Sequence, residues 1–398
     1  MSGTGRTTAT PAQLRPVYAA GFVTAFGAHS IAASLGAYTD SEHASLLTLG
    51  LLLAVYDGAE VVLKPVFGSL ADRVGPRPVL FGGLFAFALA SAAFVVAGNT
   101  ALVGVARLGQ GAAAAAFSPA AGALVARLST GKRQGRAFGG YGAWKSVGYT
   151  LGPLLGGVLV TFGGFSLLFG TLAVLAIGVA VWAVLVVPAA EPLPKARQTV
   201  LGLARRLGHP SFLRPTATLA TTTAALAVGV GFLPVAGAAA GLNTLVTGAA
   251  VSVLALSSAL VQPWSGRRRD AGRLPDGPGM AIGLGAAAAG MVLAAFVPGA
   301  VGVLVAAVAI GAGVGLATPL GFAHLAASTP RERLGQTMGA AEVGRELGDA
   351  GGPLLVGAIA ATVTLGAGFV GLAVLLAIAG AAVLGAKPMA AAPAGQEG

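Results

Sequence analysis

Charged residues are scarce in this sequence. Asp, Glu, Lys and Arg make up 9% of its 398 residues, whereas a soluble globular domain has about 25%. Such a chain has too few charged side chains to cover a surface that faces water. The composition therefore excludes an ordinary soluble domain and predicts an integral membrane protein.

Cysteine is absent, so the chain has no disulfide framework, thiolate nucleophile or cysteine-ligated metal. It also has no HExxH motif, no loop typical of a lipid-phosphate transferase and no recognisable signalling domain. We expect no catalytic residues, no metal and no cofactor. An intramembrane enzyme or a sensor without transport activity is the less favoured alternative.

What is present is long apolar sequence, 56% hydrophobic with a mean hydropathy of +0.84. A spanning helix needs roughly 20 apolar residues. The 63 glycines suit close helix packing in lipid, or they reflect only the base composition of the genome. The sequence predicts an all-α membrane protein with twelve spans, at 16–37, 44–67, 78–97, 100–126, 137–161, 164–187, 215–236, 243–265, 277–297, 299–326, 335–362 and 365–386.

The placement of positive charge predicts the orientation. All but four of the 24 Lys and Arg residues lie in the tails or in the connectors that follow even-numbered spans. By the positive-inside rule both termini are then cytoplasmic. The net charge of +11 is therefore a topology signal, and nucleic acid is not an expected partner.

An internal repeat divides the chain into two halves. The segment from Arg133 returns at Arg333, 200 residues later and without a gap. We predict a tail at 1–15 with no evident cleavable signal, a six-helix bundle at 16–187, a linker at 188–214, a second bundle at 215–386 and a tail at 387–398. The linker carries an amphipathic surface helix around 200–207, or it is a plain solvated connection.

The segment after the second span carries a recognisable motif. Gly68, three residues, Asp72-Arg73, one residue, Gly75 and then Arg77 form a polar turn, with a weaker echo from Gly266 to Asp270. This resembles the signature loop of the major facilitator superfamily, with Pro76 at a usually basic position. The resemblance, together with the motifs below, implies two bundles around a central cavity that opens alternately to each side.

In that family spans 2 and 11 are neighbours. Asp72 would then lie near the start of span 11, where the positive end of the helix dipole favours a carboxylate by about 0.3–1 kcal/mol. We expect this loop to act as a cytoplasmic gate. The alternative is a solvated turn that only sets topology.

Span 5 carries a second motif. Its positions match in full the pattern that characterises antiporter-type exporters of the family. Pro153 permits a bend, and the glycines allow a neighbouring helix to approach; generic packing is the alternative. The motif residues are Gly139, Gly148, Gly152, Pro153, Gly156 and Gly157. In the span 11 copy Val356 replaces the glycine at the position of Gly156, so we expect that copy to be structural.

Span 4 resembles the family's Arg-x-x-Gln-Gly motif at Arg107, Gln110 and Gly111, where the arginine is associated with proton transfer; a structural arginine is the alternative. Several more charges lie within spans. Their near balance predicts a paired network, either for proton coupling or purely structural. They are Asp57, Glu60, Lys64, Lys145, Glu342, Arg345, Glu346 and Asp349.

Among these charges Asp57 is the first candidate for a proton carrier and Asp349 the second. Glu60 and Lys64 have i, i+4 spacing and can pair. Asp57 lies near the midplane and has an acidic helical neighbour, so without a close cation it would hold a proton. By resemblance, the cavity residues would be His29, Tyr56, Gln110, Trp144 and His324, although a lone histidine is more often a packing residue.

Taken together, the motifs predict a proton-coupled exporter of small amphipathic or drug-like compounds. It would be a monomer in the inner (cytoplasmic) membrane, with the proton gradient as its energy source. The alternative is a proton-coupled transporter of a specific metabolite or organic anion, in either direction, since Lys145 and Arg345 could bind an anion.

Overall fold

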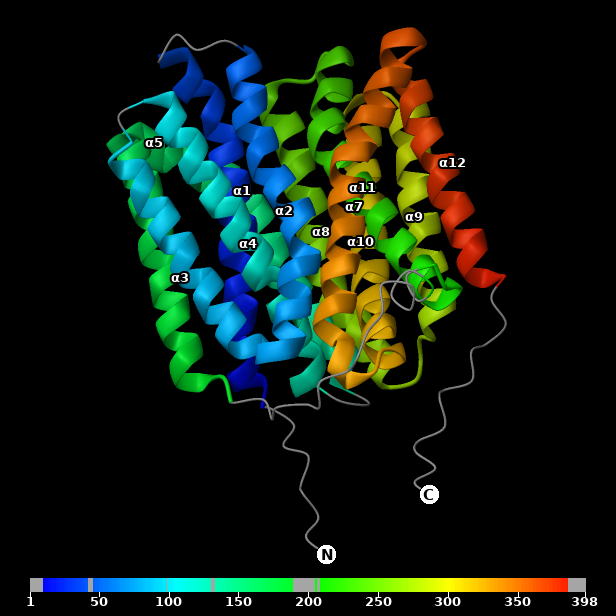
Figure 1. Ribbon diagram of the computed structural model, residues 1–398. Helices are drawn as coiled ribbons and strands as arrows, with labels where there is room; N and C mark the ends of the chain where they lie inside the picture. Colours follow the sequence, from blue (N-terminus) through cyan, green and yellow to red (C-terminus); the bar gives the residue numbers. More distant parts are fainter. Residues whose placement is uncertain are drawn as a thin grey trace, which may run out of the picture. The chain divides into compact units, whose positions relative to one another are not determined.

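In the computed structural model the described residues, 10–41, 46–97, 99–129, 133–188, 205 and 208–385, are helical apart from short connections (Figure 1). No strand occurs among them. The tails, most of the linker, residues 42–45, Gly98 and residues 130–132 lie outside the described residues. The predicted surface helix around 200–207 therefore stays a prediction, as do the predicted tails.

The helices follow the predicted spans closely. They are α1 Pro11–Ser41, α2 Leu46–Val74, α3 Pro76–Val95, α4 Thr100–Leu128, α5 Gln134–Val186, α7 Pro210–Ala239, α8 Thr244–Asp270, α9 Asp276–Phe296, α10 Gly299–Ser328, α11 Leu334–Thr362 and α12 Leu365–Leu384, with a short 3-10 turn at Arg331–Arg333.

Helix α5 contains two of the predicted spans. Its backbone leaves the helical region at Gly163 and at Gly164, where φ is +66°. This break falls on the predicted connector. The described residues thus contain twelve helical segments, and eight of the helices are long and apolar enough to cross a membrane by length and composition.

Two starts of helices show why the ends lie where they do. Asn99 accepts a hydrogen bond from Leu102 N–H at the start of α4, and Asn243 accepts one from Val246 N–H at the start of α8. An asparagine at this position satisfies a backbone donor that has no partner within the helix. These two connectors are among those predicted to lie opposite the basic ones.

The helices form two compact units. The first contains α1–α4, α5 from Gly140 onward, and the chain from Arg331 to Val343. The second contains α7–α10, α12, α5 up to Gly139, and α11 from Gly344 onward. The units are therefore not contiguous halves of the chain. The first turns of α5 belong to the second unit, and the first turns of α11 belong to the first unit.

Each unit has its own apolar core. In the first unit α4 packs against α2 and α3, and Phe87 and Phe117 meet edge to face at 5.8 Å between ring centroids. In the second unit α10 packs against α7, α8 and α9, around Leu254, Leu284 and Ile310, which are fully buried. The charged residues discussed next lie on α4 and α10 and on the helices packed around them.

Candidate functional site

The predicted loop motif is mostly helical. Helix α2 continues through Val74, and Gly75 alone separates it from α3, with φ at +94°, a value that favours glycine. The prediction of a tight polar turn from Gly68 onward was therefore wrong. No residue between Gly68 and Val74 breaks a helix, so the helix runs on until the positive φ at Gly75.

Asp72 holds the start of α11 within the first unit. Its two carboxylate oxygens accept hydrogen bonds from Gly335 N–H at 2.7 Å and Gln336 N–H at 2.8 Å. Arg127 of α4 pairs with the same carboxylate at 3.2 Å. Burial raises the pKa of Asp72 above its ordinary value, and the two N–H donors and Arg127 act against that rise. The predicted proximity to span 11 is present; the role in gating stays a prediction.

Glycines allow this approach of α2 and α11. A Cβ on Gly68 would lie 2.5 Å from Gly335 O, and one on Gly339 would lie 2.6 Å from Lys64 O. Both distances are too short for a real side chain. The two backbones are thus in direct contact, which brings Asp72 within hydrogen-bond range of the N–H groups of α11.

The basic residues of the motif have separate partners. Arg77 donates to Val184 O at 2.8 Å, near the end of α5, and lies 5.2 Å from the ring centroid of Phe81. Arg73 is exposed. Arg331 donates to Arg127 O at 3.3 Å, which adds a further link between α4 and the segment before α11.

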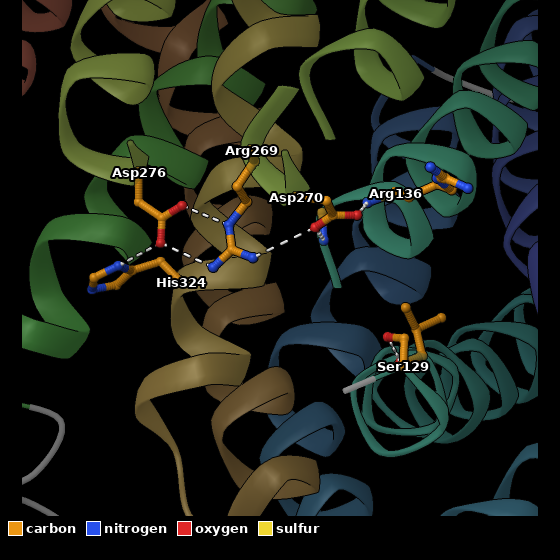
Figure 2. A network of polar contacts seen from close by, with 8 residues as sticks. Ser129, Arg136, Arg269, Asp270, Asp276 and His324 are labelled. Carbon is orange, nitrogen blue, oxygen red and sulfur yellow. Dashed lines mark hydrogen bonds and ion pairs between the residues drawn. The ribbon is translucent and has the colours of Figure 1, made fainter. Parts of the chain in front are cut away.

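The weak sequence echo has the same geometry in the second unit. Asp270, at the end of α8, accepts from Gly135 N–H and Arg136 N–H at the start of α5, both at 2.8 Å (Figure 2). A Cβ on Gly266 would clash with Gly135 O. In each unit, an aspartate near the end of one helix therefore caps the start of another. Asp72 of α2 caps α11 in the first unit, and Asp270 of α8 caps α5 in the second.

The cation beside Asp270 comes from the same helix, α8, whereas the cation beside Asp72 comes from α4. Arg269 lies 3.9 Å from Asp270 but makes two shorter bonds to Asp276, at 2.6 and 3.1 Å. His324 Nδ1 lies 3.1 Å from the same Asp276 carboxylate. His324 was predicted to line the cavity. It lies instead four residues before the end of α10, in this ionic network.

In the first unit the charges of α2 and α4 are grouped. Lys64 Nζ lies 3.0 Å from Glu60 Oε2, and both side chains are buried, so the predicted pairing is present. The Arg107 guanidinium lies 4.4 Å from the Tyr56 ring centroid and interacts electrostatically with Asp57 and Glu60. Arg107 is 2% exposed.

This arrangement changes the interpretation of Asp57. The prediction assumed that no cation is close, but Arg107 is close. Asp57 is also exposed, whereas Glu60 and Lys64 on the same helix face are buried. Lys64 lies where α11 packs against α2, and Asp57 lies about 10 Å from it along the helix.

Gln110 and Tyr56 are less accessible than predicted for cavity residues. Gln110 is fully buried and donates to Ser91 Oγ of α3 at 2.8 Å. Tyr56 is 2% exposed beneath Arg107. Both therefore position α3 and Arg107, and direct contact of either with a substrate has no support in this geometry.

The remaining span charges divide between the units. In the first unit Lys145 Nζ lies 3.7 Å from Glu342 Oε2 and 5.8 Å from the Tyr141 ring centroid. In the second unit Arg345 donates to Thr223 Oγ1 at 3.2 Å and lies 5.8 Å from the Phe322 ring centroid. The span charges of α11 thus lie in both units, with Glu342 in the first and Arg345 in the second.

Two acidic residues of α11 lie farther from the buried core. Glu346 is partly buried and Asp349 is exposed, both in the second unit. They follow Arg345 by one and four residues. Asp349 therefore keeps its place as the second candidate for a proton carrier, and that role stays a prediction.

Three glycines of the span 5 motif form a contact line with α1 in the first unit. A Cβ on Gly148 would lie 2.7 Å from Phe22 O, one on Gly152 3.0 Å from His29 Cβ, and one on Gly156 2.7 Å from Ser30 Cβ. The spacing of four residues keeps them on one helix face. α5 and α1 therefore pack backbone to backbone.

The other motif positions behave differently. Gly139 packs against Gln262 O of α8 in the second unit. Pro153 and Gly157 are exposed, and a Cβ on Gly157 would meet no atom within 4 Å. The prediction of packing at Gly157 was wrong, because this position lies one residue off the face of Gly148, Gly152 and Gly156.

Two aromatic or histidine candidates lie beside this contact line. His29 is partly buried, with Nδ1 3.1 Å from Ala25 O and its ring 4.4 Å from that of Tyr149. Trp144 is 38% exposed on α5. A contact with substrate stays a prediction for both.

Sequence reasoning missed Arg127 and Asp276. Arg127 pairs with Asp72 across 55 residues, and a pairing at that separation has no local signal. Asp276 was placed just before a span and was not considered. A sequence signal did exist for Asp270, because its spacing from Gly266 repeats that of Asp72 from Gly68.

Long apolar helices, buried ion pairs and glycine contacts define a multi-pass, all-helical membrane protein. A family model of the Major Facilitator Superfamily matches residues 17–301, and the chain belongs to that superfamily. Members of this superfamily are membrane transporters and not enzymes.

Two curated relatives are drug-resistance proteins. Multidrug resistance protein 2 of Bacillus subtilis is 30% identical over 142 residues, 36% of each chain. Quinolone resistance protein NorA of Staphylococcus aureus is 30% identical over 111 residues, 28% of this chain and 29% of NorA. The matches span about a third of the length of these relatives.

Solved structures confirm the predicted fold class of twelve helices in two bundles. The E. coli fucose:proton symporter FucP is similar with a TM-score of 0.77 at 14% identity, over 93% of this chain and 97% of FucP. The human organic anion transporter MFSD10 has a TM-score of 0.76 at 15% identity, over 94% and 100%. At these identities the likeness concerns the fold alone.

Proposed function

We propose that this transporter exports small amphipathic or drug-like compounds by alternating access in exchange for protons. It would act as a monomer in the inner membrane, with both termini cytoplasmic and no cofactor. The observation that supports this most is the contact line of Gly148, Gly152 and Gly156 against α1. These glycines belong to a motif that marks antiporter-type exporters in the family. The drug-resistance relatives support the same substrate class.

Proton exchange is proposed for Asp57 and Arg107. Asp57 is exposed at the protein surface, and the buried Arg107 lies within electrostatic range. A buried ionisable residue in a membrane span is commonly functional. Protonation of Asp57 would remove its electrostatic attraction to Arg107, which would then interact with Tyr56 and Glu60 alone among these three residues. The contacts of α4 with α2 would change as a result.

The alternative substrate is an organic anion held by Lys145 or Arg345. Lys145 already faces Glu342 at 3.7 Å, which offsets its charge. Arg345 donates to Thr223 Oγ1 at 3.2 Å and is the second candidate for an anion site. This reading predicts that Arg345→Gln weakens substrate binding more than Asp57→Asn does.

The test of the proposal is transport in proteoliposomes under an imposed pH gradient. A panel of cationic, neutral and anionic amphipathic compounds is compared with sugars and organic acids. We expect the gradient to drive accumulation of the amphipathic cations, and dissipation of the gradient to stop it. Accumulation of organic acids alone would favour the alternative, and accumulation that ignores the pH gradient would contradict proton coupling.

Asp57→Asn is expected to abolish gradient-driven transport. Because the amide cannot release a proton, substrate binding should persist but no longer vary with pH. Binding is measured by substrate fluorescence in detergent between about pH 5 and 8, where perturbed ionisable groups commonly titrate. Asp349→Asn serves as the comparison. If only the Asp349 variant loses coupling, the proton carrier is Asp349 instead.

A further inference from the structure

The side chains on one exposed face of α8 change from apolar to cationic along the helix. Leu256, Leu260 and Trp264 are 57%, 66% and 43% exposed, and Arg268 is exposed as well. These four residues are spaced by four, so they form one stripe on the helix. The stripe runs from aliphatic to aromatic to cationic over about 18 Å.

This stripe faces away from the rest of the second unit. The packed face of α8 carries Leu254, Ser258 and Gln262, and the first two of these contact Gly311 and Gly315 of α10 through their carbonyl oxygens. Positions two residues apart on a helix point in nearly opposite directions. In a membrane, the stripe is therefore exposed to lipid.

The three consecutive arginines at the end of α8 have different tasks. Arg269 bonds to Asp276 and lies near Asp270 (Figure 2). Arg268 instead lies 5.3 Å from the ring centroid of Trp264, and Arg267 is exposed beside it. The ion pairs found among the described residues do not include Arg267 or Arg268.

The backbone holds these two arginines in place. The helix closes with Gly272 N–H donating to Arg269 O and Arg273 N–H donating to Arg268 O, both at 2.9 Å. This pair of bonds is a Schellman ending, which fixes the last turn. Arg267 and Arg268 therefore lie on an ordered helix end and not on a loose connector.

The equivalent stretch of α2 lacks these features. Aligning Asp72 with Asp270 places Val62, Val66 and Leu70 at the positions of Leu260, Trp264 and Arg268. These three residues are also exposed, and Ser69 stands in place of Arg267. The repeat thus retains the lipid-facing stripe in both units but adds an aromatic ring and two cations in the second unit only.

We propose that Trp264, Arg267 and Arg268 form a binding site for the headgroup of an anionic phospholipid. The two guanidinium groups would hold the phosphodiester, Trp264 would lie at the level of the glycerol backbone, and Leu260 and Leu256 would contact an acyl chain. Tryptophan is enriched at the membrane interface, and arginines just beyond a span attract anionic lipid.

The continuity of the stripe selects a lipid as the source of the phosphate. A free phosphate ion would use only the two arginines and would leave the exposed leucines unexplained. In a lipid, the same molecule supplies an anion for Arg267 and Arg268 and an apolar chain for Leu260. The basic side of the membrane, predicted to be cytoplasmic, is the leaflet concerned.

The test is native mass spectrometry of the purified full chain in non-ionic detergent, titrated with phosphatidylglycerol or with phosphatidylcholine of the same acyl chains. We expect tighter binding of phosphatidylglycerol. The variant Arg267→Gln/Arg268→Gln should weaken that binding by about tenfold or more, because each arginine near the surface contributes appreciably. Trp264→Ala should weaken it severalfold without changing the net charge.

The control is Arg205→Gln/Arg273→Gln, which removes the same charge from two exposed positions off the stripe. Equal losses in the two double variants would show a general charge effect and would overturn the site. Displacement of phosphatidylglycerol by an excess of inorganic phosphate would show a free anion site and would also overturn it. Neither outcome depends on whether the chain exports drugs.

Discussion

At Asp72 one carboxylate satisfies two backbone N–H groups at the start of α11 and pairs with Arg127. The first N–H groups of a helix have no partner within it, and the helix dipole favours an anion there. A single side chain thereby joins α2, α4 and α11 within the first unit. Few substitutions elsewhere would remove so many contacts at once.

Asp72→Asn should reduce transport by about tenfold, since hydrogen bonds to a charged group are worth about 1.5–3 kcal/mol. The new amide keeps one acceptor oxygen, but its NH₂ group faces a backbone N–H donor, and the pair with Arg127 is lost. Initial transport rates in membrane vesicles, normalised to protein amount, measure the effect.

Accessibility provides the second measurement for Asp72→Asn. A cysteine introduced at Ala340 of α11, in this cysteine-free chain, should react faster with a maleimide when Asp72 is replaced. Ser69→Ala is the control, because the Ser69 hydroxyl donates within α2 to Pro65 O. Unchanged transport and labelling in the Asp72 variant would leave the motif as a topology signal alone.

The Glu60–Lys64 pair permits a different test at the level of single residues. Both side chains are buried, so Glu60→Gln leaves the Lys64 charge without its carboxylate and should lower the unfolding free energy by about 3–5 kcal/mol. Glu60→Leu/Lys64→Met should restore most of it, because neither charge of the pair is then left buried without the other. Unfolding is followed by tryptophan fluorescence in detergent. A single variant as stable as the parent would contradict a structural role for the pair.

Glycines of α5 form a line of close contacts with α1. Along α1, helix α5 presents Gly148, Gly152 and Gly156, whose missing side chains let the two backbones touch. In the second unit α11 approaches α7 in the same way, with Gly348 against Ala220 and Gly352 against Ala224. The repeat in sequence thus corresponds to a repeat in helix contacts.

Gly152→Leu should slow or stop transport. The new side chain would meet His29 Cβ, Phe26 O and Ser30 N, all within about 3 Å of the position of its Cβ, and inserting atoms into a packed contact costs about 1–3 kcal/mol. Substrate binding in detergent is measured alongside transport, and we expect binding to be affected less than transport.

Gly157→Leu is the matched control on the same helix. It belongs to the same motif, but a Cβ there meets nothing within 4 Å, so transport should remain near the parental rate. If both variants lose transport equally, the contact with α1 is not the reason for the motif.

At the scale of the whole molecule the sequence predicts the repeat. It predicts only some of the partners that charged side chains find on other helices. The spans could be predicted because hydropathy is local, and the break at Gly163–Gly164 lies where a connector was expected. The pairing of Asp72 with Arg127, and the place of His324 beside Asp276, depend on helices that are distant in sequence. Only packing decides which of several possible neighbours a buried charge meets.

The same limit explains Asp57 and Gly157. Helical spacing assigns Asp57 to the face of Glu60 and Lys64, but spacing does not say how far a covering helix extends along that face. For Gly157 the motif is correct, yet one residue of offset moves the position to an open side. Sequence periodicity predicts faces, and coverage has to come from the structure.

The two capping carboxylates should act independently in stability. Asp72 and Asp270 lie in different units and share no partner among the described contacts. Each Asn variant should lose about 1–3 kcal/mol of unfolding free energy. The double variant should lose the sum within about 0.5 kcal/mol, as expected for independent sites. SDS titration in mixed micelles measures all three, and a clear departure from the sum would contradict independence.

The exchange of helix starts has a mechanical consequence. The boundary between the units falls inside α5 at Gly139–Gly140 and inside α11 at Val343–Gly344. Each of these helices belongs to both units, so it could not stay both straight and attached at both ends if the units rotated separately, as the proposed cycle requires. Either the helix would bend at the glycine at this boundary, or its first turns would detach. Asp72 and Asp270 hold the first turns of α11 and α5 in place, so in such a movement the strength of these two capping contacts would decide which helix start is released.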